Sequence, residues 1–298
     1  MIKTTTIYAP EYPFLLRHIH NPPQTLYYRG TLPQGLFNIA FVGSRKMTDY
    51  GRQATEILIN GLQGLPVCIV SGLAYGIDAH AHKTALQNNL KTIAVLGSGV
   101  DDNSLYPRAH RALAYKIMEA GGALVSTYPP GTEAIQWHFP DRNQIISGLS
   151  TAVVIVEAAE KSGALITAQF ALDQNRDVFS VAGSIFQGSS AGTNNLIKNS
   201  SAKLISCAED IIVEYDKLRE LASKQMPEQI DPSLTAIQRQ ILAKIQIEPT
   251  AFAEIVAAVQ LPIPQLNSEL TLLEIKNKIR NLGNNFYTKN LTTLKQRG

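Results

Sequence analysis

The sequence predicts an α/β protein in which a doubly wound parallel sheet is followed by a small second domain. Short, wholly apolar runs alternate with stretches of helical character from residue 37 to about residue 215. The runs lack the in-and-out polarity of a half-exposed sheet, which indicates strands that are covered on both faces. A polar, proline-punctuated segment at 217–233 then separates this region from a second group of helical residues.

Composition places the chain among ordinary soluble proteins. Its 298 residues are 45% hydrophobic and 17% charged, which is typical of a folded protein with room for two domains. A net charge of +3 excludes a polycation, so any nucleic-acid binding has to come from a local patch. Cys68 and Cys207 form no CxxC pair, and no apolar run reaches membrane-spanning length. We therefore expect a cytoplasmic protein with no membrane partner.

The predicted elements can be taken in chain order. Residues 1–36 are rich in proline and aromatic residues, and they indicate an extended N-terminal segment held against the body rather than a domain. The sheet domain is expected at 37–216. Its strands are expected at 37–42, 67–71, 92–96, 123–126, 152–156, 177–181 and 203–206. Its helices are expected near 49–63, 76–88, 107–119, 142–149, 163–175 and 192–199.

The C-terminal region predicts a winged helix. After the linker at 217–233, residues 234–290 contain three helical stretches and two short β-like pieces, and 291–298 form a tail. The third helix offers Asn267 but also the carboxylate of Glu269, and the basic residues come later. We therefore expect a module that contacts proteins or the nucleic-acid backbone rather than one that reads sequence.

Four predicted strands end in turns of small residues, and such turns let backbone N–H groups approach an anion closely. Four of them on one sheet edge suggest a long anionic ligand. The turns are Gly43-Ser44-Arg45, Ser71-Gly72, Gly97-Ser98-Gly99 and Ala182-Gly183-Ser184. A GxGxxG fingerprint, an acidic residue closing the second strand and a GxxxxGK[ST] loop are all missing, so we expect neither NAD nor ATP as a cofactor.

Cations and amides near these turns are candidates for binding phosphates. Arg45 follows the first strand directly and can place two hydrogen bonds on one phosphate. The alternative is a surface arginine in a loop. The predicted phosphate-binding residues are Gly43, Ser44, Arg45, Gly97, Ser98, Gly99, Arg142, Asn143, Lys161, Ser162, Gly163 and Asn194.

Two aromatic residues are candidates for base stacking. Trp137 and Phe139 precede Arg142, and exposed rings beside cations suit unstacked bases. Alternatively, both rings fill the core and Arg142 caps a helix. Asp78 and His82 are four residues apart on a predicted helix and are placed to pair. With no Cys/His cluster elsewhere, we expect no metal.

The motifs that surround these candidates resemble those of a known family. They include Val42-Gly43-Ser44-Arg45, the run from Ser71 to Asp78, Phe139-Pro140-Asp141-Arg142-Asn143, the run from Ser162 to Ala168, and Gly192-Thr193-Asn194. In this order they resemble the DNA-processing protein A (DprA/Smf) family, and residues 234–290 resemble its C-terminal winged helix. The resemblance implies a Rossmann-like domain that binds single-stranded DNA, protects it and helps load the RecA recombinase in natural transformation, and it implies a homodimer. On this basis we expect a non-enzymatic, sequence-independent DNA-binding protein.

The chain departs from the family pattern at some positions, and other functions compete. Gln144 stands where the family usually has a second arginine, and Ala182 stands where it usually has proline. The enzymatic alternative is a nucleotide N-glycosidase of the lysine-decarboxylase-like group. Phe170 occupies the position of the glutamate that such enzymes need, which counts against it. A pure adaptor that loads a recombinase, with DNA contact incidental, also remains open.

Overall fold

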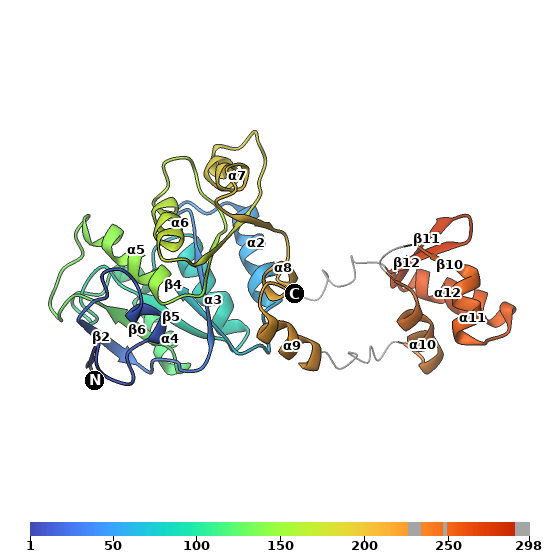
Figure 1. The fold of residues 1–298 in the computed structure, drawn as a ribbon, viewed down its shortest axis with the longest axis horizontal. Helices are drawn as coiled ribbons and strands as arrows, with labels where there is room; N and C mark the ends of the chain where they lie inside the picture. The colour runs from blue at the N-terminus through green and yellow to red at the C-terminus, as the bar shows by residue number, and fades with distance from the viewer. Residues whose placement is uncertain (226–233, 247–248, 290–298) are drawn as a thin grey trace. The chain divides into compact units, whose positions relative to one another are not determined.

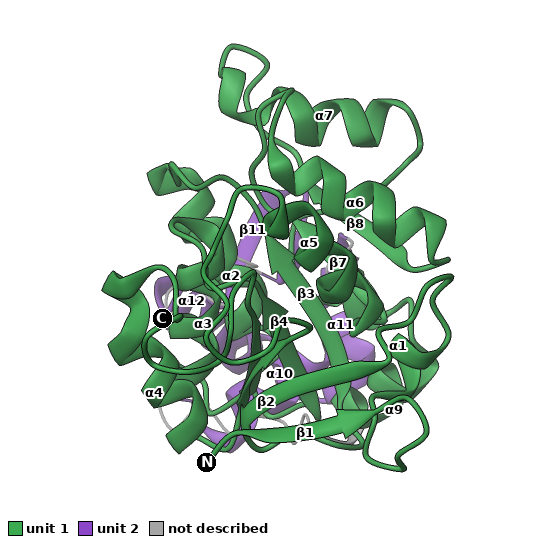
Figure 2. Cartoon of the chain, turned by 90° about the vertical axis from the view of Figure 1, so that its left-hand side faces the viewer, with its two compact units in different colours: residues 1–225 green, residues 226–298 purple. Residues whose placement is uncertain are grey.

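The structure, a computed structural model, describes residues 1–225, 234–246 and 249–289. The chain divides into two compact units, residues 1–225 and residues 226–298, which Figure 2 colours separately. Each unit has an apolar core of its own among the described residues. The α/β fold class and the C-terminal winged helix that the sequence predicts are both confirmed.

A nine-stranded sheet forms the centre of the first unit, in the order β1-β2-β6-β5-β4-β3-β7-β8-β9. The strands from β6 to β9 in this order run parallel, as predicted. Both neighbours of β3 are strands that follow it in the chain, because β4 lies on one side and β7 on the other. The parallel strands are β3 (Phe37–Val42), β4 (Val67–Ser71), β5 (Lys91–Val95), β6 (Ala123–Ser126), β7 (Ala152–Ile155), β8 (Asp177–Val181) and β9 (Lys203–Ile205).

The N-terminal segment does lie against the body, but it does so as part of the sheet. Strands β1 (Lys3–Thr6) and β2 (Thr25–Gly30) pair antiparallel with each other, and β2 pairs antiparallel with β6. Threonine and tyrosine dominate these strands, and both residue types favour a half-buried pleated surface. A short helix, α1 (Phe14–Arg17), connects the two strands.

Helices cover both faces of the sheet (Figure 1). Along β3, Ala40 and Val42 point into one core cluster, and Ile39 and Phe41 point into the other, as strict alternation requires. The first face is covered by α1, α5 (His138–Gly148), α6 (Gly163–Asp173) and α7 (Ala191–Lys198). The second face is covered by α2 (Asp49–Asn60), α3 (Ile77–Gln87), α4 (Arg111–Glu119), α8 (Glu209–Ile212) and α9 (Asp216–Gln225).

Helix α9 corrects the predicted linker. Residues 217–225 were expected to begin a linker, but they are helical, and Leu218 is buried in the core cluster of the second sheet face. The spacing of Leu218 and Leu221 puts both on one helix face, and Leu221 packs against the same cluster. The remainder of the predicted linker, residues 226–233, lies outside the described residues.

The second unit has the predicted three helices and small hairpin. Helices α10 (Ala236–Lys244), α11 (Phe252–Val259) and α12 (Ile263–Ile275) enclose a core that includes Ile241, Ile255 and Leu270. Strands β10 (Thr250–Ala251), β12 (Phe286–Lys289) and β11 (Ile279–Gly283) form a three-stranded antiparallel sheet in that order. The predicted tail at 291–298 lies outside the described residues.

Candidate functional site

A pocket lies at the point where the strand order of the sheet reverses. The chain runs outward from β3 through β4 and β5 in one direction, and it resumes on the other side of β3 with β7. In open α/β sheets, the crevice beyond the carboxyl ends of such diverging strands is the usual ligand site. Here it is a cleft of about 810 Å³, and most of its lining residues come from the loops after β3 and β7, from α5 and from the N-terminal half of α6.

Many of the predicted site residues line this cleft together. They come from segments that are far apart in the chain, and the fold joins them at one edge of the sheet. The predicted residues that line the cleft are Gly43, Ser44, Arg45, Phe139, Arg142, Asn143, Lys161, Ser162 and Gly163.

The first small-residue turn is partly occupied by Glu157. The Ser44 N–H donates to the Glu157 carbonyl oxygen at 2.7 Å, and the Thr48 N–H donates to Glu157 Oε2 at 3.0 Å. Thr48 is the N-cap of α2, so this buried carboxylate occupies the helix N-terminus where a nucleotide phosphate would otherwise bind. The Glu157 carboxylate therefore accepts a backbone hydrogen bond at the start of α2, and Glu157 is not among the residues that line the cleft. What remains for a ligand here is the Ser44 hydroxyl and the exposed side chain of Arg45.

Phe139 lies close to two guanidinium groups. Its ring centroid is 5.2 Å from Arg45 Cζ and 5.8 Å from Arg142 Cζ, and the Tyr106 ring lies 6.0 Å away. Such cation–π contacts hold the ring in place without enclosing it. Phe139 is half-buried and Tyr106 is exposed, so the cleft combines two aromatic faces with an exposed cation.

Arg142 forms the floor of the cleft. It is only 4% exposed and lies 3.6 Å from the Asp78 carboxylate, which also accepts the Gly72 N–H. Burial raises the pKa of Asp78 and lowers the pKa of Arg142, and the attraction between the two charges opposes both shifts. A Cβ on Gly72 would lie 1.3 Å from Arg142 Nη1. The Ser71–Gly72 turn therefore makes room for an arginine of the chain itself.

The helical spacing suggested that Asp78 pairs with His82. In the structure Asp78 pairs with Arg142 instead. His82 is fully buried, and its Nδ1 lies 2.7 Å from the Thr92 hydroxyl on β5. Burial lowers the pKa of His82 to about 3, so the imidazole is neutral at physiological pH.

The N-terminus of α6 forms another wall of the cleft. Ser162 is the N-cap, and its hydroxyl oxygen accepts the Ala164 N–H. Asn143 donates to the Gly163 carbonyl oxygen at 3.3 Å, which joins α5 to this turn. Lys161 is exposed beside it, and no ion pair to it is found among the described residues. The helix dipole and Lys161 both favour an anion at this wall.

The third small-residue turn is closed by the protein itself. Gly97, Ser98 and Gly99 are all buried, and none of them lines the cleft. The Gly99 N–H donates to the Thr132 carbonyl oxygen at 2.8 Å, and His138 Nδ1 lies 3.1 Å from the Gly97 carbonyl oxygen. The loop that leads into α5 therefore covers this turn, so Gly97, Ser98 and Gly99 are not open to a phosphate as the sequence had predicted.

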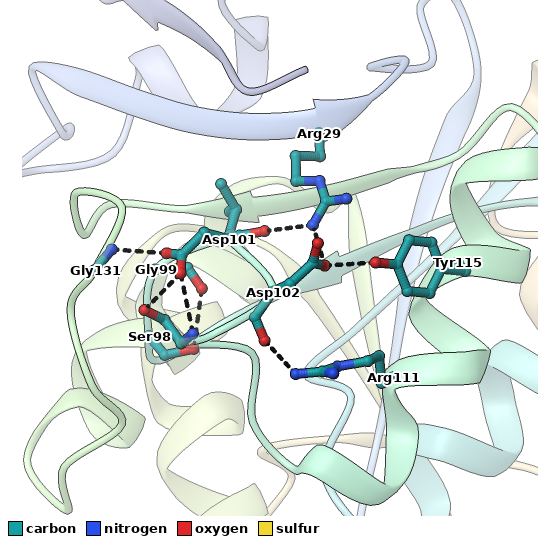
Figure 3. A network of polar contacts seen from close by, with 10 residues as sticks. Arg29, Ser98, Gly99, Asp101, Asp102, Arg111, Tyr115 and Gly131 are labelled. Carbon is teal, nitrogen blue, oxygen red and sulfur yellow. Dashed lines mark hydrogen bonds and ion pairs between the residues drawn. The ribbon is translucent and has the colours of Figure 1, made fainter.

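Polar side chains hold the chain beyond this turn in place (Figure 3). Asp101 accepts the Gly131 N–H at 2.7 Å, which fastens the covering loop. Asp102 accepts hydrogen bonds from Arg29 on β2 and from Tyr115 on α4, each at 2.7 Å. These two hydrogen bonds lower the pKa of Asp102. The N-terminal strand β2 thus helps to seal the turn after β5.

Two further predicted residues lie outside the cleft. Asn194 accepts the Gly183 N–H at 3.1 Å and donates to the Gly183 carbonyl oxygen at 3.0 Å, so its amide holds the fourth small-residue turn. Trp137 is 71% exposed, so the alternative that it fills the core is wrong. It follows Gln136, which does line the cleft.

Sequence reasoning missed several lining residues, among them Lys46, Tyr106, Gln136 and Thr167. Lys46 directly follows Arg45, and this adjacency was a usable signal. Tyr106 and Gln136 belong to loops whose approach to the cleft depends on tertiary packing.

Among the described residues, no group of three or more His, Cys, Asp or Glu side chains is placed to hold a metal ion. Each helix within the described residues is too short or too polar to cross a membrane.

Comparison with known proteins relates this geometry to a family. A family model described as DNA recombination-mediator protein A matches residues 3–216, and one described as the DprA winged helix domain matches residues 225–285. The chain is 42% identical to the DNA processing protein DprA of Streptococcus pneumoniae over 206 residues, which are 69% of this chain and 71% of that protein. It is 37% identical to Protein Smf of Synechocystis, over 89% of this chain and 75% of that protein.

Solved structures give the same result. The X-ray structure of DNA processing protein A from Streptococcus pneumoniae superposes with a TM-score of 0.67 at 39% identity, covering 72% of this chain and 75% of that one. DNA processing protein A from Helicobacter pylori, whose structure is described as giving insight into a single-stranded DNA binding mode, superposes with a TM-score of 0.63 at 26% identity. That match covers 75% of this chain and 97% of the other. The chain therefore belongs to the DNA recombination-mediator protein A family.

Proposed function

We propose that this protein binds single-stranded DNA without sequence preference, through the cleft between the carboxyl ends of β3 and β7. The observation that carries the proposal is the combination of exposed cations with aromatic faces in one cleft. Arg45, Lys46 and Lys161 are exposed there, and Phe139 and Tyr106 line the same cleft. Phosphates bind to cations and helix N-termini, while unstacked bases bind to rings.

The same chemistry favours a single strand over a duplex. A paired base has no free face for Phe139 or Tyr106, whereas every unpaired base has one. Stacking and phosphate contacts do not distinguish one base from another, which supports sequence independence. The single-stranded DNA binding described for the Helicobacter pylori relative supports the same ligand class.

We also propose that the protein is not an enzyme. Among the lining residues that the structure describes, Asp78 is the only one with a carboxylate, and it is buried against Arg142. An N-glycosidase needs an available carboxylate beside the sugar. In this chain Phe170 stands at the position where the lysine-decarboxylase-like enzymes have that glutamate. Incubation with AMP should therefore release no adenine, and enzyme-like release would contradict this proposal.

The mediator role is the finer part of the proposal. The family description as a recombination mediator supports a function in which bound DNA is protected and passed to the RecA recombinase in natural transformation. We place this function in the cytoplasm and assign it to a homodimer. The winged helix supports a protein contact rather than base reading, because α12 exposes Leu272, Glu274 and Ile275.

Fluorescence anisotropy with the full chain tests the DNA-binding proposal. Two unrelated single strands and their duplexes should be compared over a salt series. We expect both single strands to bind with similar affinity, more tightly than the duplexes, with an affinity that falls as salt rises. Equal binding to single and double strands, or a strong preference for one sequence, would contradict the proposal. Faster RecA filament assembly on prebound DNA is the expected readout for the mediator role.

A further inference from the structure

The turn after β8 exposes two large apolar side chains. Ile185 is 84% exposed and Phe186 is 90% exposed, and they are the central residues of a turn in which the Gln187 N–H donates to the Ser184 carbonyl oxygen at 3.1 Å. Turn tips are usually polar, and adjacent exposed apolar residues indicate a surface that binds something. In Figure 1 this segment lies just before α7, at the top of the first unit.

The turn is held firmly by its own neighbours. Asn194 makes two hydrogen bonds to Gly183, immediately before the turn, and the Ser190 N–H donates to the Gln187 carbonyl oxygen at 3.0 Å. A Cβ on Gly183 would lie 2.0 Å from Ser190 Oγ, so the two ends of the loop pack tightly. Phe186 is therefore presented on an ordered platform, which reduces the entropy lost when a ligand binds.

The platform is joined directly to the cleft. Strand β8 neighbours β7 in the sheet, so the two loops leave the same edge side by side. The Gly192 N–H donates to the Ala158 carbonyl oxygen at 2.8 Å, in the loop that continues to Lys161. The Tyr50 hydroxyl donates to the Ala182 carbonyl oxygen, which joins α2 to the start of the platform.

The surroundings of Phe186 suit a nucleic acid better than a protein core. Residues 178–208 contain no aspartate or glutamate, and half of residues 182–195 carry hydroxyl or amide side chains. Lys198 is exposed on α7. An aromatic ring in a segment of hydroxyl and amide groups, with no carboxylate within residues 178–208 to repel phosphates, is the composition of a stacking platform for single strands.

We propose that the Ser184–Gln187 turn is a second base-stacking site, at which Phe186 binds a base of the strand that leaves the cleft past Lys161. This inference rests on the proposed single-stranded DNA binding. It predicts that affinity depends on the length of the DNA, because a short oligonucleotide fills the cleft only, whereas a longer one also reaches Phe186.

The test compares two lengths of oligothymidylate, about 6 and about 20 nucleotides, with the full chain and its variants. Phe186→Ala should weaken binding of the longer strand about 10-fold and leave the shorter within about 2-fold, since one stacked base is lost. Tyr8→Ala is the matched control. Tyr8 is 89% exposed and lies just after β1, at the other end of the sheet. This control should bind both strands like the wild type.

The two proposals fail in different ways. If the wild type binds both strands and Phe186→Ala binds each of them as tightly as the wild type does, the second site does not exist. If the wild type binds neither strand, the proposed function itself fails. A Phe186→Trp variant that also carries Trp137→Phe gives a direct readout. Its fluorescence should be quenched by the longer strand and not by the shorter, and quenching by neither would overturn the assignment.

Discussion

Two glycine turns at the same edge of the sheet have similar sequences and opposite surroundings. The turn after β3, Gly43-Ser44-Arg45, opens into the cleft, whereas the turn after β5, Gly97-Ser98-Gly99, is buried under the loop that leads into α5. Both place small residues where a backbone must be approached closely. At the first turn, space remains for a ligand beside Arg45. At the second turn, the protein itself is the approaching group.

The remaining small-residue turns extend the comparison. Gly72 makes room for Arg142, and Gly183 is held by Asn194. A glycine at a strand exit therefore indicates close approach, and it does not identify what approaches. An exposed cation beside the turn is the better sign of an open site, and Arg45 supplies one in the open turn.

The largest expected effect concerns the buried pair beneath the cleft. Asp78→Asn should destabilise the protein by about 3 kcal/mol, because it leaves the buried Arg142 cation without its counter-charge. Urea unfolding measures this, with Asp141→Asn as the control. Asp141 directly precedes Arg142 on α5 but is exposed, so its substitution should change stability by less than about 1 kcal/mol. Equal effects would show that the pair does not support the floor of the cleft.

The open turn should govern DNA binding. Arg45→Ala is expected to weaken single-stranded DNA binding about 30-fold and to reduce the salt slope by about one, since one phosphate contact is lost. Arg108→Ala is the comparison variant, because Arg108 is an exposed arginine that does not line the cleft. An unchanged salt slope for Arg45→Ala would remove Arg45 from the contact set.

A glycine-to-alanine substitution should affect stability differently in the sealed turn, at Gly99, and at the N-terminus of α6, at Gly163. A Cβ on Gly99 would lie 2.7 Å from Asp101 Oδ2 and 2.8 Å from the Pro129 carbonyl oxygen, whereas nothing lies within 4 Å of one on Gly163. Gly99→Ala should therefore lower the free energy of unfolding by about 2 kcal/mol, and Gly163→Ala should change it by less than about 0.5 kcal/mol. Thermal unfolding of both variants tests this. Equal stability would mean that the covering loop is not tightly packed on Gly99.

The smallest expected effect is a pH dependence of the free energy of unfolding, which the buried His82 causes. The pKa of folded His82 is about 3 and lies below its unfolded value, so the unfolded chain takes up a proton first as pH falls below about 6.5. Stability is therefore lost between about pH 6.5 and pH 3. From pH 6 to pH 5, the wild type should lose about 1 kcal/mol more than His82→Gln does. Parallel pH profiles for the two proteins would contradict this account of His82.

Much of the fold could be read from the chain. The apolar runs at β3, β4, β5 and β7 are buried on both faces, so each appears in the sequence as a short, uninterrupted apolar run of strand length that ends in a turn. The first two strands were missed as strands because KTTT and TLYYRG are polar or aromatic and add antiparallel to one side of the parallel strands. Helix α9 was taken for a linker because its polar residues outnumber the few that pack on the sheet.

The site was predictable in its chemistry and less so in its extent. Arg45 and Lys161 are cations that can bind phosphates, and Phe139 has a ring that can stack on a base. These properties follow from the residue type alone, and the fold brings the three residues to one cleft. Local sequence sets which segments become strands, because burial on two faces demands uninterrupted apolar runs. Whether a strand-end turn is open or sealed depends on segments far along the chain, such as Thr132 over Gly99 and Arg142 beside Gly72. Only packing in three dimensions decides those contacts, because each is between groups that no sequence spacing connects.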